Sequence, residues 1–434
     1  MIDETLNNDN IDGAINSRIS AAVNDINESN EMSLDDFQIL INKLTNHDPE
    51  QRLQSLSFFD DFLQQDCLPP PIFIQLHNYI LMAVTQPNPP EVNNYLLSII
   101  GSISQFFDES LDFTSLVQYV NQFLSTPDAP STEQALEVLA LLASEQSGAA
   151  KVIIQFMSQL LQNFLNSDQA DNVLNVASGI TTHKEYLREM LPYLNTFLEL
   201  TPQIHGLTLD VMFSILSHFT KSSEGLDQIK NYSLIGSIFE NSQESPEIFH
   251  SALNLLIHIS NQVSNPMKFY ESAGVLNFFD ISLKSHNEEI IITGLKLCLS
   301  ISTNPAGISF LFQSGLLNVL FDLTDGTFSI TSASIQVLCN VLCEGPTELI
   351  PEFLKSNFVD LILTFILSSP QDSQILMLKA IQTIVLFLPE DDLRELVGST
   401  ELMDILWQIA EENSETTVAL IATFISDKLA PLTD

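Results

Sequence analysis

The segment LFQSGLLNVLFDLTDG at residues 311–326 has a counterpart, ESAGVLNFFDISLKSHN, which begins 40 residues earlier at Glu271. Gly274 and Gly315 lie 41 residues apart in these two segments, and an apolar run follows each glycine. Self-similarity with a period of about 20–50 residues is typical of solenoids and propellers. The pair therefore predicts a repeat protein.

One kind of turn recurs along most of the chain. In each case a large apolar residue is followed by small polar residues, often with Pro or Asp. Such segments begin at Leu44, Val84, Leu124, Leu165, Leu200, Phe239, Leu283, Leu323 and Leu367, and a degenerate one begins at Ala410. Their starts are 35–44 residues apart. Ser, Thr, Asn and Asp compete for backbone hydrogen bonds at helix ends and also cap the next helix, so each unit is predicted to contain helices.

Helical periodicity fills the stretches between these turns. Segments such as IIITGLKLCLSI place apolar residues at i, i+3, i+4 and i+7. Each unit would expose more apolar surface than it can cover, so neighbouring units must stack. We therefore predict an all-α fold, a right-handed α-solenoid of about ten armadillo/HEAT-like repeats of roughly 40 residues.

Residues 33–434 are assigned to this repeat domain, and residues 1–32 are predicted to be a disordered, acidic, Asn-rich tail. The proline-rich segments CLPPPIF and TQPNPPEV are interpreted as inter-helix turns, because proline suits a first helical turn.

The net charge of the chain indicates which classes of molecule it can bind. The chain has 55 acidic and 15 basic residues, a formal net charge of −40. Nucleic acids and anionic lipids depend on Lys and Arg, so we expect neither to bind. An acidic surface favours protein partners with a basic surface, although it also serves to keep a long apolar chain in solution.

The remaining composition indicates a monomeric protein of the cytoplasm, with the nucleus as an alternative. The N-terminus lacks the basic-then-apolar pattern of a signal peptide. The longest strongly apolar run, FVDLILTFIL, has ten residues, whereas a spanning helix needs about 20. Cys298, Cys339 and Cys343 lie in apolar helical contexts, and Cys67 precedes a proline-rich break, so we expect no disulfide and no metal.

Motifs for catalysis are missing from the sequence. It contains no HExxH, GxSxG, GxGxxG or P-loop pattern, and its carboxylate pairs are interpreted as solvated surface. We therefore expect a protein that is not an enzyme and has no cofactor.

A polar register is the main candidate for a binding site. At steps of 41 or 42 residues, one position in successive apolar helices is occupied by Ser217, His258, Leu299, Asn340, Gln382 and Thr423. All of these except Leu299 are polar. In an armadillo array the last helix of each repeat lines the concave face, where this polar ladder could bond an extended partner. The alternative is that the same groups bond between neighbouring repeats or cap backbone carbonyls internally.

Two families bear on the function. Nuclear-import receptors of the armadillo class use repeated Trp–Asn pairs, but Trp407 is the only tryptophan here, so import of classical basic signals is a poor fit. The segments LTNHDPEQRLQSLSFFDDFLQQD and VTQPNPPEVNNYLLSIIGSISQFF, within residues 44–107, resemble the opening helical pairs of the 26S proteasome non-ATPase regulatory subunit 5 family. NPAGISFLFQSGLLNVLFDLTD and SSEGLDQIKNYSLIGSIF resemble its later repeats.

The resemblance implies a non-catalytic assembly chaperone. Such a protein binds an ATPase subunit of the base of the proteasome regulatory particle during construction and leaves before completion. A general armadillo scaffold that binds a basic protein segment, or a cofactor of a heat-shock chaperone, would share the fold and remains open.

Overall fold

The computed structural model describes residues 34–45, 48–64, 68–108, 111–125, 130–232, 235–412 and 416–432. Within these ranges every regular element is a helix, and no strand occurs. The all-α prediction is confirmed. The prediction of a disordered tail at residues 1–32 and the position of Cys67 lie outside the described residues.

The chain divides into two compact units. Unit 1 comprises Met1–Glu199 and Ser214–Leu226, and unit 2 comprises Leu200–Phe213 and Asp227–Asp434. The helices up to α13 are α2 Leu34–Leu44, α3 Pro49–Leu63, α4 Pro70–Ala83, α5 Pro90–Ser102, α6 Thr114–Asn121, α7 Pro130–Glu145, α8 Ser147–Ile153, α9 Met157–Phe164, α10 Ala170–Thr182, α11 Leu187–Leu200, α12 Leu207–Phe219 and α13 Ser223–Lys230. Those that follow are α14 Ile235–Ile238, α15 Pro246–Ser260, α16 Pro266–Ala273, α17 Asn277–Leu283, α18 Glu288–Ile301, α19 Pro305–Gln313, α20 Leu316–Asp322, α21 Phe328–Glu344, α22 Ile350–Lys355, α23 Phe358–Ile366, α24 Gln371–Phe387, α25 Glu390–Ser399, α26 Leu402–Glu412 and α27 Thr417–Leu429.

The polar turns begin helices as the sequence predicts. The side chain of Asn287 accepts hydrogen bonds from the backbone N–H groups of the first turn of α18, and Asn304 does the same for α19. Helices α4 and α5 start at Pro70 and Pro90, so the described parts of the two proline-rich segments form the turn before a helix and the first turn of that helix. Each cap satisfies backbone donors that the helix itself leaves unpaired.

The glycines that first indicated the repeat occupy equivalent turns. Gly274 follows α16 and Gly315 follows α19, with φ values of 69° and 76° in the left-handed region. The corresponding turn between α22 and α23 holds Asn357, at φ 50°. Asparagine tolerates this conformation better than other residues with a Cβ, because its short polar side chain bonds locally. The turn is thus preserved where the glycine is not.

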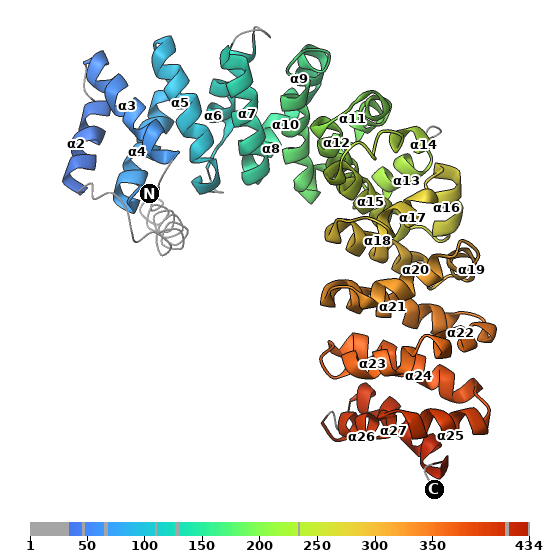
Figure 1. Cartoon of the computed structure of the whole chain (residues 1–434). Helices are drawn as coiled ribbons and strands as arrows, with labels where there is room; N and C mark the ends of the chain where they lie inside the picture. The colour runs from blue at the N-terminus through green and yellow to red at the C-terminus, as the bar shows by residue number, and fades with distance from the viewer. Residues whose placement is uncertain are drawn as a thin grey trace, which may run out of the picture. The chain divides into compact units, whose positions relative to one another are not determined.

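Unit 2 is built from sequential layers. The long helices α15, α18, α21, α24 and α27 each pack on the next in that order, and shorter helices pack beside them (Figure 1). Pairs of aromatic rings, one buried and one half-buried, join the layers: Phe279 of α17 contacts Phe310 of α19, with ring centroids 5.4 Å apart. Phe321 of α20 similarly contacts Phe353 of α22 at 5.2 Å. The core of unit 2 is therefore continuous from one layer to the next.

Unit 1 has the same sequential packing. Helix α3 packs on α5, α5 on α7, and α7 on α10 (Figure 1). Its core contains fully buried aromatic residues, among them Phe59, Phe107, Phe113 and Phe164.

Side-chain hydrogen bonds reach from one layer to the next at a nearly constant sequence separation. In unit 1, Gln146 donates to the carbonyl of Ser104 at 2.8 Å, 42 residues away, and the Nε2–H of His183 donates to the carbonyl of Ala143 at 2.7 Å, 40 residues away. In unit 2, Thr327 donates to Glu288 at 2.8 Å, 39 residues away. All three donors lie at helix ends, so polar residues in the turns between helices make contacts between neighbouring layers.

Candidate protein-binding surface

The residues of the predicted polar ladder occupy long helices but differ in exposure. His258 on α15 and Thr423 on α27 are exposed, whereas Asn340 on α21 and Gln382 on α24 are half-buried. Ser217 on α12 is half-buried and belongs to unit 1. The four polar residues of the register in unit 2 therefore lie on long helices that pack on one another in sequence. Leu299, the apolar member of the register, lies on α18 of the same series.

Asn340 contacts its neighbouring layer. Its Nδ2 donates a hydrogen bond of 3.2 Å to the hydroxyl of Ser302, the residue that follows α18, 38 residues away. On the same helix, Gln336 donates to Ser373 of α24 at 3.3 Å. At Asn340 the observed bond is thus the inter-layer bond that the sequence left open as the alternative. The role of the ladder in binding a partner stays a prediction.

A polar groove lies beside the ladder between the ends of α15 and α18. Its volume is about 680 Å³, and its walls include Asn261 and Lys296 as well as Leu299 of the register. Ser300 in the same groove bonds the hydroxyl of Tyr270 at 3.1 Å. Burial raises the pKa of Tyr270 to about 12, and the hydrogen bond to Ser300 acts in the opposite direction with a smaller effect. Apart from the ammonium group of Lys296, the groove offers neutral donors and acceptors, which suit the backbone of an extended chain.

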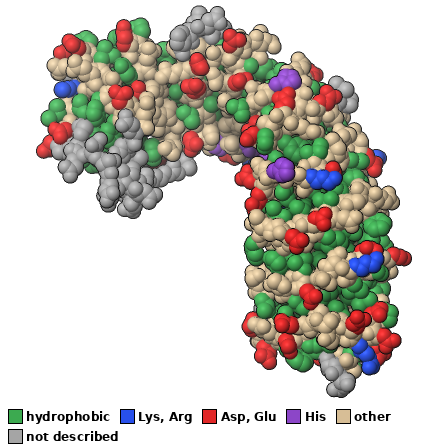
Figure 2. All heavy atoms as spheres, in the orientation of Figure 1, with side chains coloured by type: hydrophobic (Ala, Val, Ile, Leu, Met, Phe, Trp, Pro, Cys, Tyr) green, Lys and Arg blue, Asp and Glu red, His purple; other side chains and the backbone are tan. Residues whose placement is uncertain are grey.

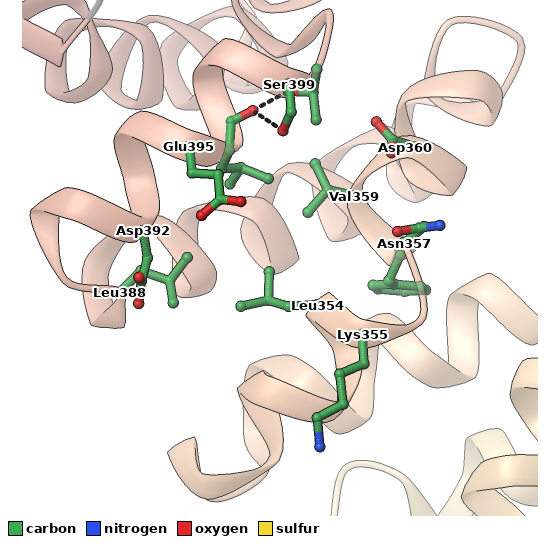
Figure 3. A pocket seen from close by; sticks show the side chains of 12 residues that line it. Leu354, Lys355, Asn357, Val359, Asp360, Leu388, Asp392, Glu395 and Ser399 are labelled. Atoms are coloured by element: carbon green, nitrogen blue, oxygen red, sulfur yellow. Dashed lines mark hydrogen bonds between the residues drawn. The ribbon is translucent and has the colours of Figure 1, made fainter.

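A second pocket lies between the α22–α23 turn and α25, in a place that the register does not include. Its volume is about 420 Å³. Figure 3 shows Leu354 and Val359 directed toward its centre, with Glu395 reaching in from α25. The hydroxyls of Ser399 and Thr400 both bond the carbonyl of Leu396, at 3.3 Å and 2.8 Å, and so order the end of α25 (Figure 3).

Carboxylates are spread over the surface of the chain. In the face drawn in Figure 2, acidic side chains are scattered over both units, and basic side chains are few. With 55 acidic and 15 basic residues, at least 40 carboxylates have no basic residue to pair with one to one. The field at this surface attracts cations and repels anions, and salt screens it beyond about 8–10 Å.

The three cysteines in the described part of the chain are not arranged for metal binding or nucleophilic chemistry. Cys298 and Cys339 are buried, and burial raises the pKa of both thiols well above the ordinary value. Cys343 is half-buried, and burial raises its pKa to about 11. A thiol protonated at neutral pH is a poor nucleophile and a poor ligand. Among the described residues, no group of three or more His, Cys, Asp or Glu could hold a metal ion.

No single helix in the described ranges has both the length and the apolar character needed to cross a membrane. One pair of helices, Pro305–Gln313 with Leu316–Asp325, has the combined length and composition but is bent by 79°.

Comparison with known proteins bears on the fold alone. No family model matches the chain, and no curated protein matches it. Among solved structures, it is similar to an engineered protein whose crystal structure was determined by the Northeast Structural Genomics Consortium. The TM-score is 0.70 at 16% sequence identity, over 92% of this chain and 99% of that chain. The engineered protein therefore has a similar arrangement of helices, and its sequence says nothing about function here.

Proposed function

We propose that the chain is a non-catalytic, armadillo/HEAT-like helical solenoid that binds a protein partner with a basic surface. The single observation that supports it best is the combination of a large carboxylate excess with a layered helical structure. Sequential layers that contact only their neighbours create long continuous surfaces, and such surfaces are the usual protein-binding sites of repeat proteins. Basic protein segments are the class of partner that the charge favours.

The partner to test first is an ATPase subunit from the base of the proteasome regulatory particle. The support is the resemblance of residues 44–107 and of the later repeats to the non-ATPase regulatory subunit 5 family. On this proposal the chain acts as an assembly chaperone in the cytoplasm, holding the ATPase subunit during construction and leaving before completion. It performs no reaction of its own.

The experiment is affinity capture from native extract with the tagged full chain, at low and at moderate salt, read by mass spectrometry. The proposal expects base ATPase subunits without core-particle subunits, and less of them at moderate salt. Purified ATPase subunits should then bind directly in the absence of extract. A heat-shock ATPase captured in place of the base subunits would overturn the chaperone assignment and favour the adaptor alternative. Capture unaffected by salt would contradict the charge argument.

A further inference from the structure

The pocket between the α22–α23 turn and α25 combines an apolar floor with an acidic rim. Leu354, Val359 and Leu388 supply apolar lining, and Val359 is buried. Asp360, Asp392 and Glu395 line the same pocket and are exposed. Two chain segments, separated in sequence by the whole of α24, thus form one concave site (Figure 3).

Local structure fixes both walls. Asn357 adopts the left-handed conformation that turns the chain from α22 into α23, and the fully buried Phe358 anchors the start of α23. On α25, Asp392, Glu395 and Ser399 are spaced i, i+3 and i+7, so they share one helix face. The buried Leu393 fixes the orientation of that face. The rim carboxylates are therefore held by secondary structure and not by a loop.

The charge of the lining selects the ligand. Its charged residues are Lys355, Asp360, Asp392 and Glu395, one basic and three acidic, which gives a net charge of −2. Lys355 is itself paired with Glu352 at 2.9 Å, so it does not balance the rim. An anion is disfavoured at this site. A cation with a long apolar stem fits both parts of it, because Lys and Arg bury their methylene groups while the charged end stays near water.

We propose that this pocket receives an arginine side chain from the protein partner. The methylene groups pack against Leu354, Val359 and Leu388, and the guanidinium lies beside Glu395, between Asp360 and Asp392 on opposite sides of the pocket (Figure 3). Arginine is preferred to lysine because its planar, weakly hydrated guanidinium donates to several carboxylate oxygens at once. The proposal rests on the proposed function, since it names the side chain by which a basic partner is recognised.

The first test uses the full chain with ¹³C-labelled Leu and Val methyl groups. The probes are acetyl-Gly-Arg-Gly-amide and its neutral analogue, in which citrulline replaces arginine. The arginine peptide should shift the methyl signals of Leu354, Val359, Leu388 and Leu396, and the citrulline peptide should not. Equal shifts with both peptides, or shifts spread over the whole surface with no excess at these four residues, would overturn the proposal.

The second test compares two triple variants with the same change in charge. Asp360→Asn, Asp392→Asn and Glu395→Gln remove the rim, whereas Glu289→Gln, Asp404→Asn and Asp427→Asn remove exposed carboxylates elsewhere in unit 2. Binding of a fluorescent peptide of alternating Arg and Ser is measured by anisotropy. The rim variant should bind about five- to tenfold more weakly than the control variant, since exposed charge pairs each contribute little.

The outcomes separate the two proposals. If the peptide binds the wild-type chain and both variants lose affinity equally, the pocket assignment fails while a basic partner is still recognised. If the peptide does not bind the wild-type chain at all, the proposed function fails together with the pocket. Matching thermal unfolding of the two variants checks that both remain folded.

Discussion

The α7–α10 interface of unit 1 and the α18–α21 interface of unit 2 are packed in different ways. In the first, Gly179 brings two backbones together: a Cβ at this position would lie 2.9 Å from both the carbonyl oxygen of Ala140 and the amide nitrogen of Ser144. In the second, the side chain of Asn340 crosses to Ser302, and a polar groove lies beside α18. Backbone contact leaves no surface for a partner, whereas the half-buried side chain of Asn340 still exposes part of its surface.

The largest expected effect comes from filling the α7–α10 contact. Gly179→Ala should destabilise unit 1 by about 1–3 kcal/mol, because the added methyl group meets backbone atoms that cannot rotate away. Urea unfolding measures the change. The control is Gly398→Ala near the end of α25, where no atom lies within 4 Å of the added group. That substitution should be neutral or stabilising by up to about 1 kcal/mol, because alanine favours the helix. If Gly398→Ala destabilised the chain as Gly179→Ala does, the close backbone contact at Gly179 would not be the cause.

The hydrogen bond between Asn340 and Ser302 should contribute less to the free energy of unfolding. A double-mutant cycle of Asn340→Leu and Ser302→Ala is expected to give a coupling free energy of about 0.5–1.5 kcal/mol, the usual net value of a side-chain hydrogen bond. Urea unfolding of the four proteins provides the cycle. A coupling near zero would mean that Asn340 is held by its helix alone and that Ser302 is irrelevant to it.

Binding tests whether the ladder is also an exchangeable surface. Asn340→Ala with Gln382→Ala should weaken the binding of a basic partner several-fold while the chain stays folded, because the two half-buried amides lie on neighbouring packed helices. Anisotropy with the alternating Arg–Ser peptide measures affinity, and circular dichroism monitors folding. Equal affinity of the double variant and the wild-type chain would remove the ladder from the binding site and leave its amides a purely structural role.

The smallest effect is expected for His77, a buried polar residue in unit 1. His77 is buried against Phe73 and Phe107, its Nε2 has no hydrogen-bond partner, and burial lowers its pKa. As pH falls through about 6.5, the unfolded chain takes up a proton that the folded chain does not, so acid destabilises the fold. In the His77→Phe variant, the free energy of unfolding should therefore decrease less between neutral and mildly acidic pH than in the wild-type chain. The exposed His286→Gln is the control, and an unchanged slope in the His77 variant would contradict this account.

Particular residues show how far sequence reasoning reaches. The polar turns predict helix starts because a cap is a local interaction, and Asn287 and Asn304 make the expected bonds. The 41-residue period predicts the helix on which Asn340 lies and its position along that helix. It does not predict the hydrogen-bond partner, because the distance to Ser302 depends on how two layers pack. The pocket beside Asn357 was missed for a related reason. Asparagine replaces the glycine of the earlier turns, and α24 separates the two walls in sequence.

The central claim is that the acidic chain selects basic protein segments. Its most direct test is the affinity of the wild-type chain for the labelled peptide of alternating Arg and Ser, measured beside a peptide in which every arginine is citrulline, across a series of salt concentrations. Only the arginine peptide should bind, and its affinity should fall steadily as the salt concentration rises, because the attraction is screened. Equal binding of the two peptides, or an affinity that does not change with salt, would contradict the central claim.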